Sequence, residues 1–327
     1  MPNQKILITG GGGFVGSHLA EAEIRNGNQV VALDLTPPDK VEHLLKDKNF
    51  RYVQGDILNK SLVESLVKEA DLIYHLAAIA CPKTYIEDPL MILNVNLGGL
   101  QLIIETAYRY NKKFVFSSSS EIYGKNLKVP WHEDDDRVLG ATKTSRWVYS
   151  TAKAVGEHYC YAYAQKGLKM AMCRFFNFYG PRLDFIGRGR VMPCFLEKFL
   201  TNQPVEVVEP GDQTRCFTYI DDGIEGILKV AHLPEAEGEV FNLGAPDETT
   251  ILELAQLMKK IGNFQSNIVI VPAQKIYGEG YEDIFRRVPD ITKAKQILKW
   301  EPKTKLKDGL EKTINYYKDI YKRNKNI

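Results

Sequence analysis

Short apolar runs alternate with amphipathic segments along the first half of the chain. The runs are rich in Val, Ile, Leu and Phe and are bounded by Gly, Asn, Asp or Lys, which predicts β-strands. We expect strands at 5–10, 29–34, 50–56, 71–78, 113–119 and 168–177. We expect helices between them, at about 13–26, 61–68, 90–110 and 147–166. Because the strands are apolar on both faces and alternate with helices, the pattern predicts an α/β fold with a doubly wound parallel sheet.

The pattern changes after the segment Tyr179-Gly180-Pro181. Loops lengthen, Pro and Gly recur, and the apolar runs shrink to VEVV (205–208) and EVFNL (239–243). Helices are expected near 191–202, 221–232, 250–261 and 304–320. We therefore predict a sheet domain over residues 1–178 and a smaller α/β lobe over residues 179–327. A segment near 215–245 is expected to return in part to the first domain.

Composition narrows the class of protein. The 327 residues are 44% hydrophobic and 26% charged, which is ordinary for a soluble globular chain. The net charge of +2 comes without a concentrated basic stripe, so we expect no nucleic-acid partner. Five cysteines without CxxC or CxxH spacing predict reduced thiols, with neither a disulfide framework nor a metal site.

Two further observations bear on the location of the protein. The first predicted strand begins within a few residues of Met1, which leaves no room for a signal peptide ahead of it. No apolar run approaches the ~18 residues that a membrane-spanning helix needs. We expect a cytoplasmic protein with no membrane partner.

A glycine-rich turn joins the first strand to the first helix. Gly10, Gly13 and Gly16 form a GxxGxxG pattern within the segment TGGGGFVG. Glycine there permits a tight turn, lets backbone approach a pyrophosphate and lets the helix pack on the strand. The helix N-terminus, at Phe14 and Val15, then points its free N–H groups at the phosphates. The turn predicts a Rossmann-like dinucleotide-binding domain.

Residues at the ends of the next strands support the same cofactor. Asp34 ends the second strand, where a carboxylate accepts both ribose hydroxyls and repels a 2′-phosphate, which favours NAD over NADP. Asp56 and Ile57 follow the third strand and are placed to meet the adenine. Small residues after the fourth strand let backbone run along the cofactor at Leu76, Ala77 and Ala78. Two interpretations stay open for Asp56, cofactor contact or a helix cap, and two for His75, cofactor contact or a buried core histidine.

Tyr149 and Lys153, in the segment YSTAK, are candidate catalytic residues on the helix expected at 147–166. The i, i+4 spacing places both side chains on one helix face. A lysine ammonium beside a phenol lowers the pKa of the phenol, because the phenolate gains a nearby positive charge. A tyrosine with a pKa near neutral takes a proton from a sugar hydroxyl as hydride leaves for NAD. Tyr149 and Lys153 are also expected to contact the cofactor, since the lysine can hold the nicotinamide ribose. The strand end FSSSSEIYG supplies four serines and Glu121 to the same sheet edge.

The combination of TGGGGFVG, HLAA, FSSSSEIYG, YSTAK and FFNFYGPR resembles the extended short-chain dehydrogenase/reductase family of nucleotide-sugar enzymes, over nearly the whole chain. The resemblance implies bound NAD, a nucleoside-diphosphate-sugar substrate and oxidation of the sugar C4 hydroxyl. It implies that Ser119 hydrogen-bonds the sugar O4, with Tyr149 as base and Lys153 as its partner. It also implies a homodimer packed through the helices near 90–110 and 147–166. Apolar residues compatible with that packing are Leu97, Leu100, Ile104, Tyr159 and Tyr163.

Further segments resemble the UDP-glucuronate decarboxylases, notably the decarboxylase domain of the bifunctional polymyxin-resistance enzyme. These segments are SSSEIYG, SRWVYSTAK, NFYGPRLD, RCFTYIDDGIEGI and YGEGYEDIFRRVPDI. The resemblance implies that Glu121 and Arg287 are active-site residues, with Ser120 beside them. One departure is that Ser119 replaces a threonine, and the hydroxyl that carries the role is retained.

The chemistry of a UDP-glucuronate decarboxylase suggests catalytic roles for Arg287 and Glu121. A ketone at C4 is β to the C5 carboxylate, and such a β-keto acid loses CO2 to leave an enolate that needs a cation and later a proton. Arg287 either holds the carboxylate in a bidentate pair or grips the diphosphate. Glu121 either organises water near C5 or makes a structural contact, as a lysine partner or turn cap. The substrate-binding set is completed by Asn177, Arg215 and Tyr277, with Tyr281 also a candidate for the sugar pocket.

The sequence leaves the product and several alternatives open. The product is UDP-xylose or a UDP-4-keto-pentose, depending on whether the hydride returns. The main alternative is a UDP-hexose or UDP-glucuronate 4-epimerase, which keeps the carboxylate. A UDP-apiose-type synthase and a catalytically silent NAD-binding regulator are more distant alternatives. The regulator is opposed by the presence of Ser119, Tyr149 and Lys153 together.

Overall fold

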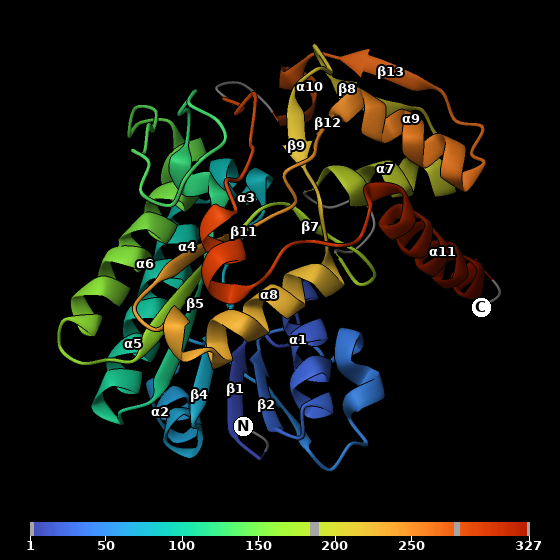
Figure 1. Cartoon of the computed structure of the whole chain (residues 1–327). Coiled ribbons are helices and arrows are strands. Elements are labelled where there is room, and N and C mark those ends of the chain that lie inside the picture. The colour runs from blue at the N-terminus through green and yellow to red at the C-terminus, as the bar shows by residue number, and fades with distance from the viewer. Residues whose placement is uncertain (1–2, 184–189, 278–281, 326–327) are drawn as a thin grey trace.

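The computed structural model describes residues 3–183, 190–277 and 282–325. Within that part of the chain, a seven-stranded parallel sheet has the strand order β11-β6-β5-β4-β1-β2-β3 (Figure 1). The strands are β1 (Lys5–Thr9), β2 (Gln29–Asp34), β3 (Phe50–Gln54), β4 (Leu72–His75), β5 (Lys113–Ser119), β6 (Met170–Phe175) and β11 (Val240–Leu243). The predicted doubly wound α/β fold is therefore confirmed.

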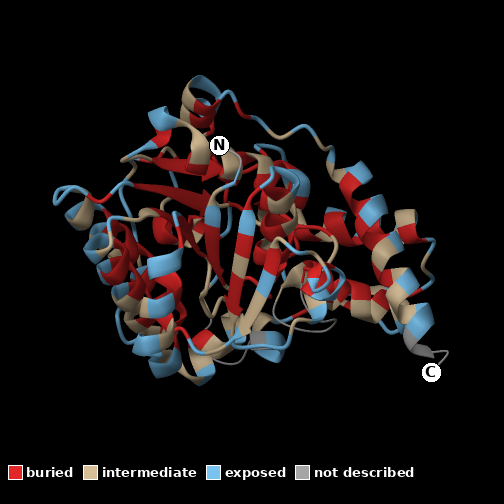
Figure 2. Ribbon diagram, turned by 90° about the horizontal axis from the view of Figure 1, so that it is seen from below, coloured by how far each residue is buried: buried red, intermediate tan, exposed pale blue. Residues whose placement is uncertain are grey.

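Helices cover both faces of this sheet. One layer holds α2 (Lys60–Glu69), α5 (Gly99–Arg109) and α6 (Val148–Ala164), and the other holds α1 (Phe14–Arg25) and α8 (Ile220–His232). Strand β1 shows the arrangement, because Ile6 and Ile8 belong to the core under α1 whereas Leu7 belongs to the core under α2 and α5. Figure 2 shows the central strands almost entirely buried. This two-sided burial explains why the strands are continuous apolar runs.

Several predicted elements end earlier than expected. Strand β4 ends at His75 rather than at residue 78, and β6 ends at Phe175, two residues before Asn177. Asn177 has a φ of 39°, a left-handed conformation that strand pairing does not allow. The helix expected at 90–110 consists of α4 (Pro89–Leu93), a π-helical turn at Asn94–Gly98 and α5. The chain thus leaves the sheet after His75 and after Phe175, at the carboxyl ends of β4 and β6.

The segment Pro89–Arg109 is, among the described residues, one helix long and apolar enough to span a membrane by length and composition alone. The sequence prediction missed it because it sought an uninterrupted apolar run, and Asn94, Asn96 and Gln101 divide this segment into shorter runs. In the structure 44% of its most apolar window is buried in the protein, and α5 packs on α2 and α6. Its Leu100 and Ile104 are core residues, so packing on the sheet accounts for their apolar character.

The second half of the chain forms a smaller lobe and also completes the large sheet (Figure 1). Its paired strands are β7 (Phe178–Tyr179) with β10 (Thr218–Tyr219), β8 (Val205–Val208) with β13 (Ile268–Val271), and β9 (Thr214–Cys216) with β12 (Glu248–Thr250). Its helices are α7 (Val191–Leu200), α9 (Ile251–Gly262), α10 (Ala273–Tyr277) and α11 (Leu306–Lys325). Between these elements, α8 packs on the first half and β11 pairs with β6 as the edge strand of the large sheet.

The short helix α3 (Pro82–Glu87) follows β4 and brings Tyr85 against α6. The 3-10 turn Ser120–Tyr123 follows β5, and a second one at Ser145–Trp147 precedes α6. Both turns lie where the serine-rich strand end and the YSTAK segment meet. This edge of the sheet therefore gathers the predicted catalytic residues.

Candidate active site

The glycine-rich turn is a close-packed cradle. Gly10 has a φ of 73°, and a Cβ there would lie 2.8 Å from the backbone N of Ala77. A Cβ at Gly16 would lie 2.1 Å from the carbonyl O of Gly10. Helix α1 starts at Phe14 without a side-chain cap, so the N–H groups of its first turn keep their capacity to bind an anion.

Asp34 is held at the rim of this turn by the backbone. Its Oδ2 accepts from the N–H of Gly12 at 3.0 Å, and its Oδ1 accepts from the N–H of Thr36 at 3.0 Å. An uncapped helix N-terminus beside an oriented carboxylate fits a pyrophosphate next to a ribose with free hydroxyls. The residues present therefore fit NAD, with Phe14 and Val15 at the phosphates and Asp34 at the ribose.

Asp56 and His75 make structural contacts in this structure. The Asp56 Oδ1 accepts from the N–H of Leu58 at 2.8 Å, so the exposed carboxylate shapes the turn before α2. The His75 Nδ1 lies 2.8 Å from the Thr9 hydroxyl, inside the sheet. Burial, with a smaller effect of the Lys153 charge, lowers the pKa of His75 to about 3. His75 is thus a neutral core histidine, the second of its two interpretations.

The backbone after β4 and β3 runs beside the cradle. Leu76 donates its N–H to the Thr9 carbonyl at 3.0 Å, and Ala77 lies against Gly10. Ala78 is half-buried and follows directly, whereas Ile57 is a buried core residue. Contact of these residues with the cofactor stays a prediction.

Tyr149 and Lys153 share one face of α6, as their spacing predicts. The buried Tyr149 ring stacks on Tyr85 with centroids 4.9 Å apart and planes 8° apart. The Lys153 Nζ lies 5.8 Å from the centre of the Tyr149 ring and donates to the Ser117 carbonyl at 2.5 Å. The Ser119 hydroxyl accepts from the N–H of Glu121 at 3.2 Å, which caps the 3-10 turn.

The predicted lowering of the tyrosine pKa is wrong for this structure. Burial raises the pKa of Tyr149 to about 12, and the Glu121 carboxylate adds to the effect against smaller opposing contributions from Arg190 and Ser119. Burial also lowers the pKa of Lys153 to about 7. The sequence shows the spacing of the two residues but not their depth, and depth dominates both pKa values.

Replacing Lys153 by Met is expected to stabilise the fold by about 2–4 kcal/mol at neutral pH. The lysine binds its proton in the unfolded chain up to its ordinary pKa of 10.5, but in the folded chain only up to about 7. The unfolding free energy of the wild type therefore rises with pH between about 7 and 10.5. The variant exceeds the wild type in unfolding free energy by the full amount below pH 7, and this difference shrinks towards pH 10.5. Urea unfolding of both proteins at pH 6.5 and pH 10 checks this. A difference that does not change with pH would contradict it.

Glu121 lies between two buried arginines. The Arg146 Nη1 is 2.7 Å from its Oε2, and the Arg287 Nη1 donates to its Oε1. Burial alone would raise the pKa of Glu121, but the two guanidinium charges hold it well below its usual range. Glu121 is therefore a carboxylate that accepts hydrogen bonds, with arginine partners in place of the lysine or turn cap considered from the sequence.

Arg146 was missed by the sequence prediction. It lies three residues before Tyr149, in the 3-10 turn Ser145–Trp147 that leads into α6, and this short spacing is the signal that was available. Its guanidinium carbon lies 5.9 Å from the centre of the Tyr85 ring, on which Tyr149 stacks. Arg190, at the N-cap of α7, was also missed, although its charge lowers the pKa of Tyr149.

A second carboxylate extends the cluster to Arg215. The Asp283 Oδ1 lies 2.7 Å from the Arg215 Nη2 and 3.9 Å from the Arg287 Nη2. Arg215 is 8% exposed, so its ion pair with Asp283 is not a surface salt bridge. Charges thus alternate along Arg146, Glu121, Arg287, Asp283 and Arg215, with one more guanidinium than carboxylate.

The other residues predicted to bind the substrate lie in different environments. Ser120 is 2% exposed, next to Glu121. Asn177 donates its Nδ2 to the Cys216 carbonyl at 3.2 Å, which holds it at the junction of the two halves. Tyr277 ends α10 and its side chain is not among the described ones, and Tyr281 lies outside the described residues. In the part of the chain that the structure covers, no group of three or more His, Cys, Asp and Glu side chains could hold a metal ion.

Comparison with known proteins places this arrangement in a family. The model of the NAD dependent epimerase/dehydratase family matches residues 6–244. The chain is similar to a UDP-N-acetyl-alpha-D-glucosaminuronate decarboxylase of Bacillus cytotoxicus, at 38% identity over 97% of this chain and 98% of the relative. It is similar to UDP-D-apiose/UDP-D-xylose synthase 1 of Arabidopsis thaliana, at 35% identity over 97% of this chain and 92% of the relative.

A solved structure shows the same likeness. The UDP-glucuronic acid 4-epimerase of Bacillus cereus, solved with UDP-glucuronic acid and NAD, superposes with a TM-score of 0.85 at 28% identity, covering 97% of this chain and all (100%) of that one. The family match extends over most of the chain, and the glycine turn and Asp34 fit the cofactor named in the family description. The chain therefore belongs to the NAD-dependent epimerase/dehydratase family, and NAD is its cofactor.

Proposed function

We propose that the protein is a UDP-hexuronate decarboxylase that oxidises C4 of UDP-glucuronate and releases CO2. The observation that carries the proposal is the pairing of one buried carboxylate, Glu121, with two buried arginines, Arg146 and Arg287, beside Tyr149. Two guanidinium groups beside one carboxylate suit the carboxylate of a uronic acid, because an arginine binds a carboxylate through paired, charge-assisted hydrogen bonds. The decarboxylase relative at 38% identity supports the same reaction class.

The first half of the reaction uses the Tyr149 side of the site. NAD, held by the Gly10–Gly16 turn and Asp34, supplies the hydride acceptor when bound. Ser119 hydrogen-bonds the sugar O4, and the phenolate form of Tyr149 takes the proton from the C4 hydroxyl. Because burial raises the pKa of Tyr149, this form depends on nearby positive charge. Lys153, whose Nζ lies 5.8 Å from the centre of the Tyr149 ring, supports the phenolate. The positive charge of Arg190 also favours the phenolate, because it acts to lower the pKa of Tyr149.

The second half uses the arginine cluster. The C4 ketone is β to the C5 carboxylate, so cleavage of the bond between C5 and the carboxyl carbon leaves its electron pair in an enolate and releases CO2. Arg287 holds the carboxylate beforehand and faces the enolate afterwards, where a fixed cation stabilises the charge. Glu121, because it is ionised, orients the two arginines and does not supply the proton that C5 receives.

The nature of the C2 substituent and the fate of the hydride define the finer proposal. The relative from Bacillus cytotoxicus acts, by its name, on an N-acetylated uronate, so both UDP-glucuronate and UDP-N-acetylglucosaminuronate are substrates to test. A 4-epimerase is the second candidate, because the Bacillus cereus structure is that of a UDP-glucuronic acid 4-epimerase. A UDP-apiose-type synthase is favoured by the name of the plant relative alone.

One assay separates these functions. Purified protein with NAD is incubated with each UDP-uronate and with UDP-glucose, and CO2 release and the sugar products are followed. CO2 from a uronate supports the decarboxylase, and NMR of the product then distinguishes UDP-xylose from UDP-apiose and a UDP-4-keto-pentose. A C4 epimer without CO2 supports the epimerase. No turnover of any of these sugars would refute both and leave the regulator.

We also propose that the protein is a homodimer packed through α4, α5 and α6. Leu100 and Ile104, singled out in the sequence, are fully buried in the core and so cannot be interface residues. The exposed large apolar side chains of these helices are instead Leu90, Met91, Tyr108 and Tyr161. Light scattering is expected to give twice the 37.1 kDa chain mass, and Met91→Glu is expected to shift the mass towards one chain. A monomeric wild type would refute the proposal.

A further inference from the structure

One buried polar cluster contains none of the residues that the sequence predicts for the active site. It is centred on Arg174 of β6 and Asn242 of β11, which are paired neighbours in the sheet. Arg174 is 6% exposed and Asn242 is 0% exposed. Polar groups at such depth destabilise a fold unless they are hydrogen-bonded, so their partners reveal what the cluster holds in place.

Arg174 uses its guanidinium to tie three segments together. Its Nε and Nη2 donate to the two carboxylate oxygens of Glu157, on α6, at 2.9 and 2.7 Å. Its Nη1 donates to the Tyr123 hydroxyl at 2.7 Å and to the Glu133 carbonyl at 2.6 Å. Glu157 lies one helical turn after Lys153, so the cluster reaches the Tyr149 and Lys153 side of the site.

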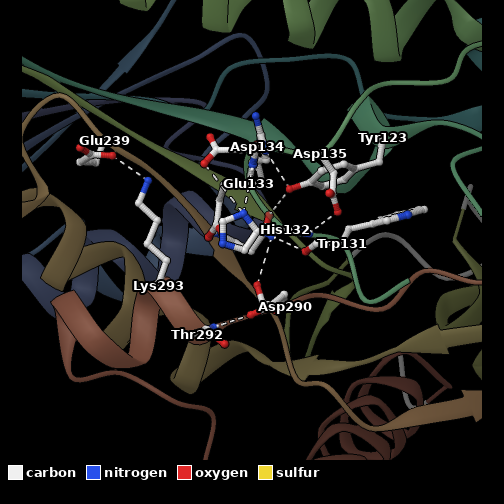
Figure 3. A network of polar contacts seen from close by, with 12 residues as sticks. Tyr123, Trp131, His132, Glu133, Asp134, Asp135, Glu239, Asp290, Thr292 and Lys293 are labelled. Carbon is white, nitrogen blue, oxygen red and sulfur yellow. Dashed lines mark hydrogen bonds and ion pairs between the residues drawn. The ribbon is translucent and has the colours of Figure 1, made fainter. Parts of the chain in front are cut away.

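Asn242 is bonded through both ends of its amide. Its Oδ1 accepts from the Tyr123 hydroxyl at 2.8 Å. Its Nδ2 donates to the carbonyl groups of Trp131, at 2.9 Å, and Asp290, at 3.2 Å. Its backbone N–H donates to the Glu133 Oε1 at 2.8 Å. Figure 3 shows Tyr123, Asp290 and the neighbouring residues Trp131 and Glu133 gathered from three segments of the chain.

The cluster is attached to both partners of the Glu121–Arg287 pair. Tyr123 belongs to the same 3-10 turn as Glu121, Ser120–Tyr123. On the other side, the N–H of Trp131 donates to the Val288 carbonyl at 2.8 Å, and the N–H of Asp290 donates to the Trp131 carbonyl at 2.8 Å. These two hydrogen bonds hold Val288 and Asp290, which closely follow Arg287 in the chain, against Trp131. The Tyr123 hydroxyl is the link between the two attachments, since it bonds Arg174 and Asn242 at once.

We infer that Arg174, Tyr123 and Asn242 are positioning residues that set Arg287 opposite Glu121 for recognition of the substrate carboxylate. The inference rests on the proposed function in its choice of ligand. All three side chains are buried and fully engaged with protein groups, so they act through Glu121 and Arg287 and not by contact with the substrate. Removal of one polar atom leaves buried partners unpaired, which disturbs the whole network.

The test compares Tyr123→Phe with Tyr74→Phe as a matched control. Both tyrosines are 0% exposed, and each hydroxyl bonds a buried polar group, but the Tyr74 hydroxyl bonds Glu23 on α1, which is not a residue of the proposed site. Calorimetry measures the affinity of NAD-loaded protein for UDP-glucuronate and for UDP-glucose. Tyr123→Phe is expected to weaken UDP-glucuronate binding about tenfold and to leave UDP-glucose within about twofold, because one unpaired buried group is worth about one factor of ten. Tyr74→Phe is expected to change neither affinity.

Crystal structures of the two variants supply a readout that does not depend on the ligand. Tyr123→Phe is expected to move the Arg287 guanidinium away from Glu121, and an unchanged pair would overturn the inference. Equal weakening of both ligands, or of neither, would also overturn it. If the wild type binds UDP-glucuronate no more tightly than UDP-glucose, the proposed function fails, and the crystal structures still decide the positioning role. Should Tyr123→Phe not fold, Asn242→Asp is measured instead, because it keeps the acceptor for Tyr123 and removes both donors.

Discussion

Tyr149→Phe is expected to abolish NADH formation from a UDP-uronate, with a fall in rate of about 10²–10⁴-fold. The change removes the group proposed to take the C4 hydroxyl proton, and the ring that stacks on Tyr85 remains. Single-turnover absorbance measures NADH directly, before any CO2 is lost. The loss is therefore expected in the oxidation step itself.

Two measurements test whether weaker NAD binding or a less stable fold, and not loss of the base, accounts for this result. NAD affinity and the melting temperature of Tyr149→Phe are expected to stay close to wild type, because the glycine turn and Asp34 do not contact the phenol. Tyr74→Phe, which also removes a buried hydroxyl, is expected to retain NADH formation. Undiminished NADH formation by Tyr149→Phe would show that another group is the base.

Glu121→Gln is expected to slow CO2 release at least about 100-fold and to leave NAD affinity within about twofold of wild type. The amide cannot balance Arg146 and Arg287, so the two guanidinium groups repel each other and lose the geometry that we propose for binding the substrate carboxylate. The measurements are CO2 release and NADH formation in the same single turnover. A normal ratio of the two would reject a role for Glu121 in the carboxylate step.

The same variant carries a stability signature with a definite pH dependence. The pKa of Glu121 is depressed in the folded chain, so its ion pairs stabilise the fold above the ordinary glutamate pKa of 4.5 and lose that effect as pH falls further. At neutral pH the variant is expected to lose about 3 kcal/mol of unfolding free energy, and the loss shrinks below about pH 4. Glu23→Gln is the matched control, since Glu23 is a buried carboxylate bonded to Tyr74 and His232. It is expected to lose stability without changing the ratio of CO2 to NADH.

The fold was predictable because its strongest signals are local. Two-sided burial produces continuous apolar runs, and the turn after β1 admits only glycine at Gly10, where backbone lies within 3 Å of a would-be Cβ. The Tyr149–Lys153 spacing likewise follows from helix geometry. What the sequence does not contain is the depth of a side chain, and depth reversed the expected pKa of Tyr149.

The polar partners were harder to predict for a different reason. Glu121 meets Arg146 and Arg287, and Arg174 meets Glu157 and Tyr123, across distances in the chain that only the fold determines. A signal was nevertheless present, since a lone arginine in the apolar strand MAMCRF requires a buried carboxylate partner. Which carboxylate that is depends on how α6 lies over β5 and β6.

The edge strand β11 has a consequence for how the chain reaches its native form during synthesis. Residues up to 178 leave the ribosome with the open side of β6 still exposed, and Arg174 still lacks the neighbouring strand that carries Asn242. An unpaired strand edge invites pairing with other chains. The large sheet of the first half is therefore complete only after Leu243 has been synthesised, when β11 can pair with β6.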